Sequence, residues 1–201
     1  MLELICVRHG RTAWNADLRF QGQTNVPLDE EGRAQALRAG AQLRSVALDA
    51  AYSSDLDRSS ETARIILASH PKVPLHLDPD LRELAFGTWE GLTWAQILET
   101  DPTIDREGRT SPRFYAAPGG EKFEDAVLRA GRAVERIRAE NHSGRILVVT
   151  HAGILHALLQ VVLGEVEGER FRVRFVPGSI TRFGFDGSGS ARLLALNVSD
   201  G

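Results

Sequence analysis

Cysteine and lysine are scarce in this sequence, and arginine carries almost all of its positive charge. The single cysteine, Cys6, can form no intrachain disulfide and cannot supply a multi-cysteine metal site, so we expect a small buried side chain. The only lysines are Lys72 and Lys122. Arginine suits the binding of carboxylate or phosphate, but genome composition or heat adaptation would explain the bias equally well.

Long apolar runs and a strong net charge are also missing. No apolar run approaches the length of a membrane span, and we expect no secretory signal ahead of the first predicted strand. The net charge of −3 and the pI near 6.1 argue against general binding to nucleic acid or to a membrane surface. We therefore expect a cytoplasmic protein with a small-molecule ligand. The oligomeric state stays open, with a homodimer as one option.

The length of 201 residues suits one domain with a well-buried core, which we expect to span residues 1–201. Apolar strand-like runs alternate with helical patterns along the chain. This order predicts an α/β fold: a three-layer α/β/α sandwich with a mostly parallel sheet and an antiparallel edge. The predicted strands are 2–7, 48–52, 75–77, 145–150, 171–185 and 191–198, the predicted helices are 30–46, 56–69, 93–99, 121–141 and 154–163, and the predicted loops are 14–22, 81–91 and 101–120.

Polar residues follow three of the predicted strands. The first strand ends at Arg8-His9-Gly10, the second leads through Ser53-Ser54-Asp55 to Arg58, and a later one ends at His151-Ala152-Gly153. Ligands in open α/β sheets bind beyond the carboxyl ends of the strands, so these residues are candidates for one site. The loop at 81–91 adds a carboxyl group, Glu83.

These residue types are the ones that phosphoryl transfer needs. Two guanidinium groups can hold the oxygens of a phosphoryl group, and the helix starts after Asp55 and at Ala152 can add backbone N–H donors. A neutral imidazole can attack phosphorus in line and form a phosphohistidine. Glu83 could protonate the leaving alkoxide and then activate the water that removes the phosphoryl group.

Each of these residues also has an ordinary structural explanation. Arg58 could pair with Asp55 or Glu61 on its own helix. His151 could be a buried histidine that caps the following helix, and Glu83 could be a surface glutamate. The residues alone leave these alternatives open.

Four blocks of sequence, in this order, resemble the histidine phosphatase (phosphoglycerate mutase-like) superfamily. They are Val7-Arg8-His9-Gly10 with Trp14-Asn15, Tyr52-Ser53-Ser54 with Arg58 and Glu61-Thr62-Ala63, Leu81-Arg82-Glu83 with Phe86-Gly87 and Trp89-Glu90-Gly91, and Val149-Thr150-His151-Ala152-Gly153. The resemblance runs from residue 3 to about residue 185.

The resemblance implies a phosphoglycerate mutase-like fold and a reaction that needs no metal and no cofactor. It makes His9 the phosphorylated nucleophile and Glu83 the proton donor and acceptor. Arg11 stands where many members carry Gln or Glu. It could widen the positive field for an anionic substrate or form a surface ion pair, and we favour the ion pair. The resemblance places Arg8, Arg58 and His151 with His9 and Glu83 in the catalytic set, and it predicts that phosphate or substrate is bound by Arg8, Asn15, Gln21, Gly22, Arg58, Glu83, His151 and Ala152.

The segment 114–121 resembles broad-specificity phosphatases and α-ribazole phosphatases, and the short chain favours a phosphatase over a mutase. We therefore predict a hydrolase of the histidine acid phosphatase type that acts on small phosphorylated metabolites. Phe86, Trp89, Phe114 and Tyr115 would give a partly apolar pocket, although core packing explains the tryptophan as well. A cofactor-dependent phosphoglycerate mutase is one alternative. A non-catalytic binder of phosphorylated ligands is another, disfavoured because it would not need Glu83.

Overall fold

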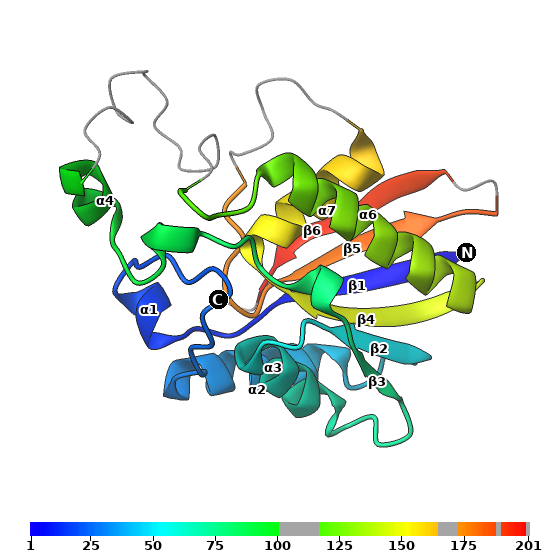
Figure 1. The fold of residues 1–201 in the computed structure, drawn as a ribbon. Helices are drawn as coiled ribbons and strands as arrows, with labels where there is room; N and C mark the ends of the chain where they lie inside the picture. The colour runs from blue at the N-terminus through cyan, green and yellow to red at the C-terminus, as the bar shows by residue number, and fades with distance from the viewer. Residues whose placement is uncertain (101–116, 165–172, 188–189, 200–201) are drawn as a thin grey trace.

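A six-stranded sheet forms the middle layer of the protein, in the order β3-β2-β4-β1-β5-β6. The computed structural model describes residues 1–100, 117–164, 173–187 and 190–199 (Figure 1). β4 lies between β1 and β2 and pairs with both in parallel, and β3 pairs in parallel with β2. β5 is antiparallel to β1, and β6 is antiparallel to β5. The strands are β1 (Leu2–Arg8), β2 (Ala50–Ser53), β3 (Leu75–Leu77), β4 (Gly144–Thr150), β5 (Ile180–Phe185) and β6 (Ala191–Val198).

Two pairs of helices cover opposite faces of the sheet, as Figure 1 shows: α6 with α7, and α2 with α3. On α6, the buried residues recur every three or four positions, which is the pattern of a helix with one apolar face. No helix within the described residues is long and apolar enough to cross a membrane. The helices are α1 (Ala13–Ala16), α2 (Glu30–Leu43), α3 (Asp57–Leu67), α4 (Trp94–Thr100), α6 (Phe123–Glu140) and α7 (Ala152–Leu163), with short 3-10 turns η1 (Pro79–Leu81) and η2 (Gly87–Trp89).

The predicted three-layer sandwich with an antiparallel edge is confirmed. Because β2, β4 and β1 are parallel neighbours, Ser53, Val149 and Val7 lie side by side at their carboxyl ends. The central strands are buried on both faces, which explains why they read as nearly continuous apolar runs. The three polar strand ends singled out in the sequence therefore meet at one edge of the sheet.

Two predicted segments differ from the observed structure. The predicted loop 14–22 begins inside α1, which Thr12 caps by accepting a hydrogen bond from the amide of Asn15. The predicted strand 171–185 is formed only from Ile180 onward, because Pro177 lacks an N–H group and Gly178 takes a φ of +78°. Residues 171–172 of that prediction, and 101–116 of the predicted loop 101–120, lie outside the described residues.

The loop after β1 approaches the start of α2 so closely that two glycines are required. A Cβ atom on Gly10 would lie 2.2 Å from the carbonyl oxygen of Gly32, and one on Gly32 would lie 2.0 Å from the carbonyl oxygen of Arg11. Both opposing atoms belong to the backbone and cannot swing away. The position of the loop that carries His9 therefore depends on these two glycines.

Gly32→Ala should destabilise the fold by about 1–3 kcal/mol, because the added methyl group overlaps backbone atoms. Gly131→Ala on α6 is the matched control, since its Cβ would meet nothing closer than Val161 at 3.9 Å. That control should gain roughly 0.5–1 kcal/mol from helix propensity. Urea unfolding measures both changes, and an equal gain in the two variants would contradict the close approach.

Candidate active site

A cavity of about 530 Å³ lies at the edge of the sheet where the polar strand ends meet. Every site residue predicted from the sequence lines it, with the exception of His151. Those lining residues are Arg8, His9, Asn15, Gln21, Gly22, Arg58, Glu83 and Ala152.

His9 is a buried imidazole with one defined free nitrogen. Its backbone N–H donates to the carbonyl of Thr150, 2.9 Å away, which fixes it beside the end of β4. The ring Nδ1 lies 2.7 Å from the carbonyl oxygen of Gly10, which can only accept, so Nδ1 carries the proton and Nε2 keeps its lone pair. Burial lowers the pKa of His9 well below its ordinary value, and the charges of Arg58 and Arg8 add to this effect. The ring is therefore neutral at neutral pH.

Arg58 is fully buried, and it binds backbone carbonyls instead of carboxylates. Its terminal nitrogens donate to the carbonyl oxygens of Thr24 at 2.9 Å and Gly22 at 2.7 Å. Burial lowers the pKa of Arg58 to about 10, which leaves it charged at neutral pH. Asp55 pairs with Arg82, and Glu61 pairs with Arg33, so the pairing of Arg58 with its own helix is wrong.

Glu90 holds the loop that receives Arg58. Its carboxylate accepts hydrogen bonds from the amides of Gln23 at 3.0 Å and Thr24 at 2.9 Å, and from the hydroxyl group of Thr24. Gly22 has a φ of +53°, and a Cβ there would lie 1.9 Å from a Glu90 oxygen. The sequence block Trp89-Glu90-Gly91 carried the resemblance, but gave no sign that Glu90 braces the carbonyls that bind Arg58.

Arg8 is anchored by the segment before β5. Its Nη1 donates to the carbonyl oxygen of Phe175 at 2.6 Å, and its backbone carbonyl accepts from the amide of Gly178 at 3.0 Å. Phe175 and Pro177 both line the cavity. The irregular course of residues 173–179 thus forms a wall of the site, which a regular strand there would not do.

Glu83 points inward, and the surface-glutamate explanation is wrong. Its side chain is 9% exposed, and its two carboxylate oxygens accept from the amides of Leu84 at 3.0 Å and Gly153 at 3.2 Å. A Cβ on Gly153 would lie 2.3 Å from a Glu83 oxygen, so the glycine makes room for the carboxylate. Glu83 and the start of α7 consequently share one wall of the cavity.

The two predicted helix starts differ in what their first residues contact. Ala152, the first residue of α7, lines the cavity, whereas the amide of Asp57 at the start of α3 donates to Asn25 Oδ1. That the helix start after Asp55 adds N–H donors to the site stays a prediction. Arg58, one residue into α3, reaches the site through its long side chain.

His151 packs behind His9 and does not line the cavity. The two ring centroids are 5.0 Å apart, and His151 Nε2 lies 3.2 Å from Ser59 Oγ. His151 occupies the N-cap position of α7, but its side chain makes no capping hydrogen bond, so the helix-cap explanation is wrong. Burial lowers the pKa of His151 well below its ordinary value. Electrostatic interactions with the neighbouring Arg58, His9, Arg8 and Arg129 lower this pKa further.

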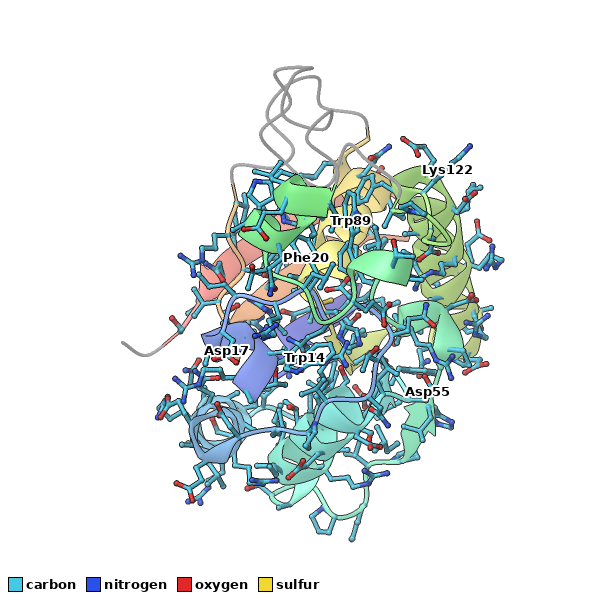
Figure 2. All side chains as sticks on the ribbon, turned by 60° about the vertical axis from the view of Figure 1, so that its left-hand side comes forward. Trp14, Asp17, Phe20, Asp55, Trp89 and Lys122 are labelled. Carbon is cyan, nitrogen blue, oxygen red and sulfur yellow. The ribbon has the colours of Figure 1, made fainter. Side chains whose placement is uncertain are left out.

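Aromatic rings form the apolar part of the wall. Phe20 and Phe86 line the cavity with ring centroids 5.1 Å apart. Trp89 lies close to Phe20, as Figure 2 shows, but does not line the cavity. The two ring centroids are 6.1 Å apart, and Trp89 is only 5% exposed. Core packing therefore explains the tryptophan, and its predicted place in the pocket is wrong. Phe114 and Tyr115 lie outside the described residues.

Residues that were not among the predicted site residues also line the cavity. Arg11 does so while paired with Asp29 at 2.8 Å, which confirms the ion pair favoured for it. No group of three side chains able to hold a metal ion occurs among the described residues. The other additional lining residues are Leu18, Arg19, Gln35, Leu84, Phe123, Gly153 and Arg174.

Comparison with known proteins decides the family. The sequence model of the histidine phosphatase superfamily (branch 1) matches residues 4–199. The chain belongs to the histidine phosphatase superfamily. In structure, this family member is similar to YhfR of Bacillus stearothermophilus, with a TM-score of 0.90 and 32% identity over 100% of this chain and 98% of that one.

Relatives in the superfamily include both phosphatases and mutase-like proteins. A metal-independent phosphoserine phosphatase of Arabidopsis thaliana is 38% identical over 162 residues, 78% of this chain and 66% of that protein. Phosphoglycerate mutase-like protein 4 of the same plant is 36% identical over 160 residues, 79% of this chain and 70% of that protein. The chain spans about half the length, 53%, of three mycobacterial relatives.

The lowered pKa of His9 predicts a specific loss of stability in acid. The unfolded chain takes up a proton on this ring near pH 6.5 and the folded chain does not, so stability falls as the pH drops below that value. The share of one histidine is at most about 1.4 kcal/mol per pH unit. Urea unfolding between pH 7.5 and 5.5 should therefore show a shallower pH dependence for His9→Asn than for the unsubstituted protein. Equal pH dependence in the two proteins would contradict a neutral buried His9.

Proposed function

We propose that the protein is a phosphomonoester hydrolase of the histidine acid phosphatase type, with His9 as the nucleophile. The observation that carries the proposal is the state of His9: a neutral ring on the cavity wall, with the proton on Nδ1 and the Nε2 lone pair left for attack. Arg8 and Arg58 line the same cavity as cations, and Glu83 is the carboxyl group on it. The family assignment supports the same chemistry.

The first step transfers the phosphoryl group to the enzyme. Nε2 of His9 attacks phosphorus, while the bond from phosphorus to the ester oxygen breaks on the opposite side. Glu83 in its protonated form gives its proton to the leaving oxygen, so that an alcohol departs. Arg8 and Arg58 bind the phosphoryl oxygens. The ring of His151 packs against that of His9 from behind.

The second step restores the enzyme. Glu83, now a carboxylate, takes a proton from a water molecule, and the oxygen of that water attacks phosphorus. The bond between phosphorus and Nε2 breaks, inorganic phosphate leaves, and His9 returns to its neutral form. Proton, electron pair and phosphoryl group are thus accounted for without a metal ion, in keeping with the name of the Arabidopsis phosphoserine phosphatase.

The cavity favours small phosphate esters that are partly apolar. Asn15, Gln21 and Gly22 lie near the phosphate-binding arginines on its wall, and Phe20 and Phe86 offer an apolar surface to the alcohol part. A volume of about 530 Å³ suits a metabolite. We therefore propose that the ligand is a small phosphorylated metabolite and that the protein binds neither nucleic acid nor a membrane.

Hydrolysis of p-nitrophenyl phosphate in the presence of EDTA tests the proposal directly. His9→Ala should lower the rate to less than about one thousandth, because the nucleophile is lost. His142→Ala is the matched control, since His142 is exposed and does not line the cavity. Acid-labile, base-stable phosphate should be trapped on His9 after a brief quench. Strict dependence on a metal ion, or label on serine or aspartate, would overturn the mechanism.

A phosphoglycerate mutase is the second candidate, favoured by the similarity to phosphoglycerate mutase-like protein 4. The two activities differ in what accepts the phosphoryl group from His9: water in a hydrolase, a phosphoglycerate in a mutase. Incubation with 3-phosphoglycerate and its bisphosphate separates them. We expect free phosphate to accumulate, whereas 2-phosphoglycerate as the main product would establish the mutase.

A further inference from the structure

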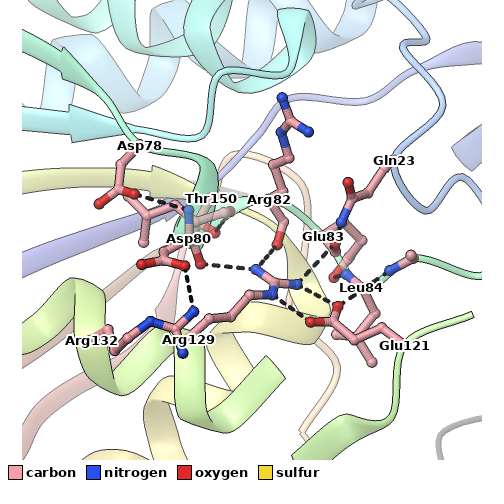
Figure 3. A network of polar contacts seen from close by, with 12 residues as sticks. Gln23, Asp78, Asp80, Arg82, Glu83, Leu84, Glu121, Arg129, Arg132 and Thr150 are labelled. Atoms are coloured by element: carbon pink, nitrogen blue, oxygen red, sulfur yellow. Dashed lines mark hydrogen bonds and ion pairs between the residues drawn. The ribbon is translucent and has the colours of Figure 1, made fainter. Parts of the chain in front are cut away.

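A buried arginine on α6, Arg129, has no part in the function proposed above, yet it is hydrogen-bonded at every donor. The residue is 8% exposed. Its five N–H groups have five acceptors: Oε1 and Oε2 of Glu121 at 2.6 and 2.8 Å, and the carbonyl oxygens of Asp80, Arg82 and Glu83 at 2.8, 2.5 and 3.1 Å (Figure 3). A guanidinium group used so completely has one orientation.

The carbonyls that Arg129 binds belong to the segment that carries Glu83. Figure 3 shows the guanidinium group between this segment and Glu121. The remaining carbonyl of the run, that of Leu81, accepts from the hydroxyl group of Thr150 at 2.8 Å. All four carbonyls from 80 to 83 are thus bound by side chains. Within the part of the chain that the structure describes, no strand pairs with this segment, so side chains must satisfy its buried carbonyls.

Glu121 extends the support to the other side of Glu83. Its backbone N–H donates to the carbonyl of Ala85 at 2.8 Å, and its Oε2 lies 3.4 Å from the amide of Ala85. Arg129 and Glu121 together therefore hold the chain at residue 83 and at residue 85. Between these points, the Glu83 carboxylate reaches the amide of Gly153 on the cavity wall.

We propose that Arg129, paired with Glu121, is a positioning residue that aims the Glu83 carboxyl group at the leaving oxygen of the substrate. Arg129 is absent from the cavity lining, so it acts through Glu83 and not on the substrate. The inference rests on the role of Glu83 in the proposed function, and deepens it.

The dependence of the rate on the leaving group separates this role from a merely structural one. A strongly basic leaving oxygen needs the proton from Glu83, whereas p-nitrophenolate leaves readily without it. A displaced Glu83 therefore slows poor leaving groups selectively. A loss of folded protein, in contrast, lowers all rates by the same factor. The parameter to compare is kcat/KM, because it reports on the steps up to departure of the alcohol and excludes the later attack of water.

The experiment measures kcat/KM for substituted phenyl phosphates from p-nitrophenyl to p-methoxyphenyl phosphate. Arg129→Met should reduce the value for p-methoxyphenyl phosphate by roughly 10–100-fold, as misplacement of a catalytic group does. The value for p-nitrophenyl phosphate should fall by less than about threefold, since this ester needs little help from an acid. The loss in kcat/KM for Arg129→Lys should be smaller than that for Arg129→Met, because an ammonium group keeps the charge but cannot donate to five acceptors.

Two further variants give the experiment its reference points. Glu83→Gln removes the acid itself and should show the same selective loss, to a greater extent. Arg132→Met is the matched control from the same helix, because Arg132 binds the side chain of Asp80 at 2.8 Å and is 59% exposed. It should leave the ratio between the two esters unchanged.

The failure of this inference can be told from the failure of the proposed function. If Glu83→Gln shows the selective loss while Arg129→Met slows all esters equally, the positioning role is overturned and the function stands. If Glu83→Gln itself shows no selective loss, the proposed acid is wrong. Should Arg129→Met not fold, Glu121→Gln carries the same test, since it keeps the volume and weakens the bidentate ion pair that orients Arg129.

Discussion

Hydrogen bonds from buried and partly buried arginines to backbone carbonyls are the interaction on which the site depends. Arg58 binds the carbonyls of Gly22 and Thr24, Arg8 binds that of Phe175, and Arg129 binds three in a row. Each bond joins a helix or strand to a loop or a short 3-10 turn. Carbonyl oxygens orient a guanidinium group without neutralising it, so Arg58 keeps its charge for an anion.

The positive charge of the arginines also affects the protonation state of His9. Burial already disfavours a charged imidazole, and two nearby cations lower the pKa of His9 further. A carboxylate partner for Arg58 would weaken this effect and would compete with phosphate for the same donors. The choice of carbonyls over carboxylates as partners of Arg58 therefore serves both tasks: it helps to keep His9 neutral and it leaves Arg58 able to bind an anion.

The sequence predicts the sheet, its strand ends and the residues that face the cavity, because these follow from local apolar pattern and from motif order. It does not reveal which side chains bind backbone carbonyls, because every residue has the same carbonyl group and no motif marks the ones that are bound. Arg129 shows the limit: an arginine on the apolar face of a helix is a signal, but the carbonyls that it binds lie more than 40 positions away. The strand predicted from residue 171 fails at Pro177 and Gly178, where two residues outweigh an otherwise apolar pattern.

Two glycines on the cavity wall, Gly22 and Gly153, have a structural role in the same loops. A Cβ on Gly22 would overlap the carboxylate of Glu90, and one on Gly153 would overlap that of Glu83. In both cases the carboxylate is bound by backbone amides of the loop or helix start that the glycine occupies or adjoins. The glycine lets the carboxylate approach the backbone, and the carboxylate in turn fixes the backbone. Each glycine and its glutamate therefore act as a unit, although the two residues lie far apart in the sequence.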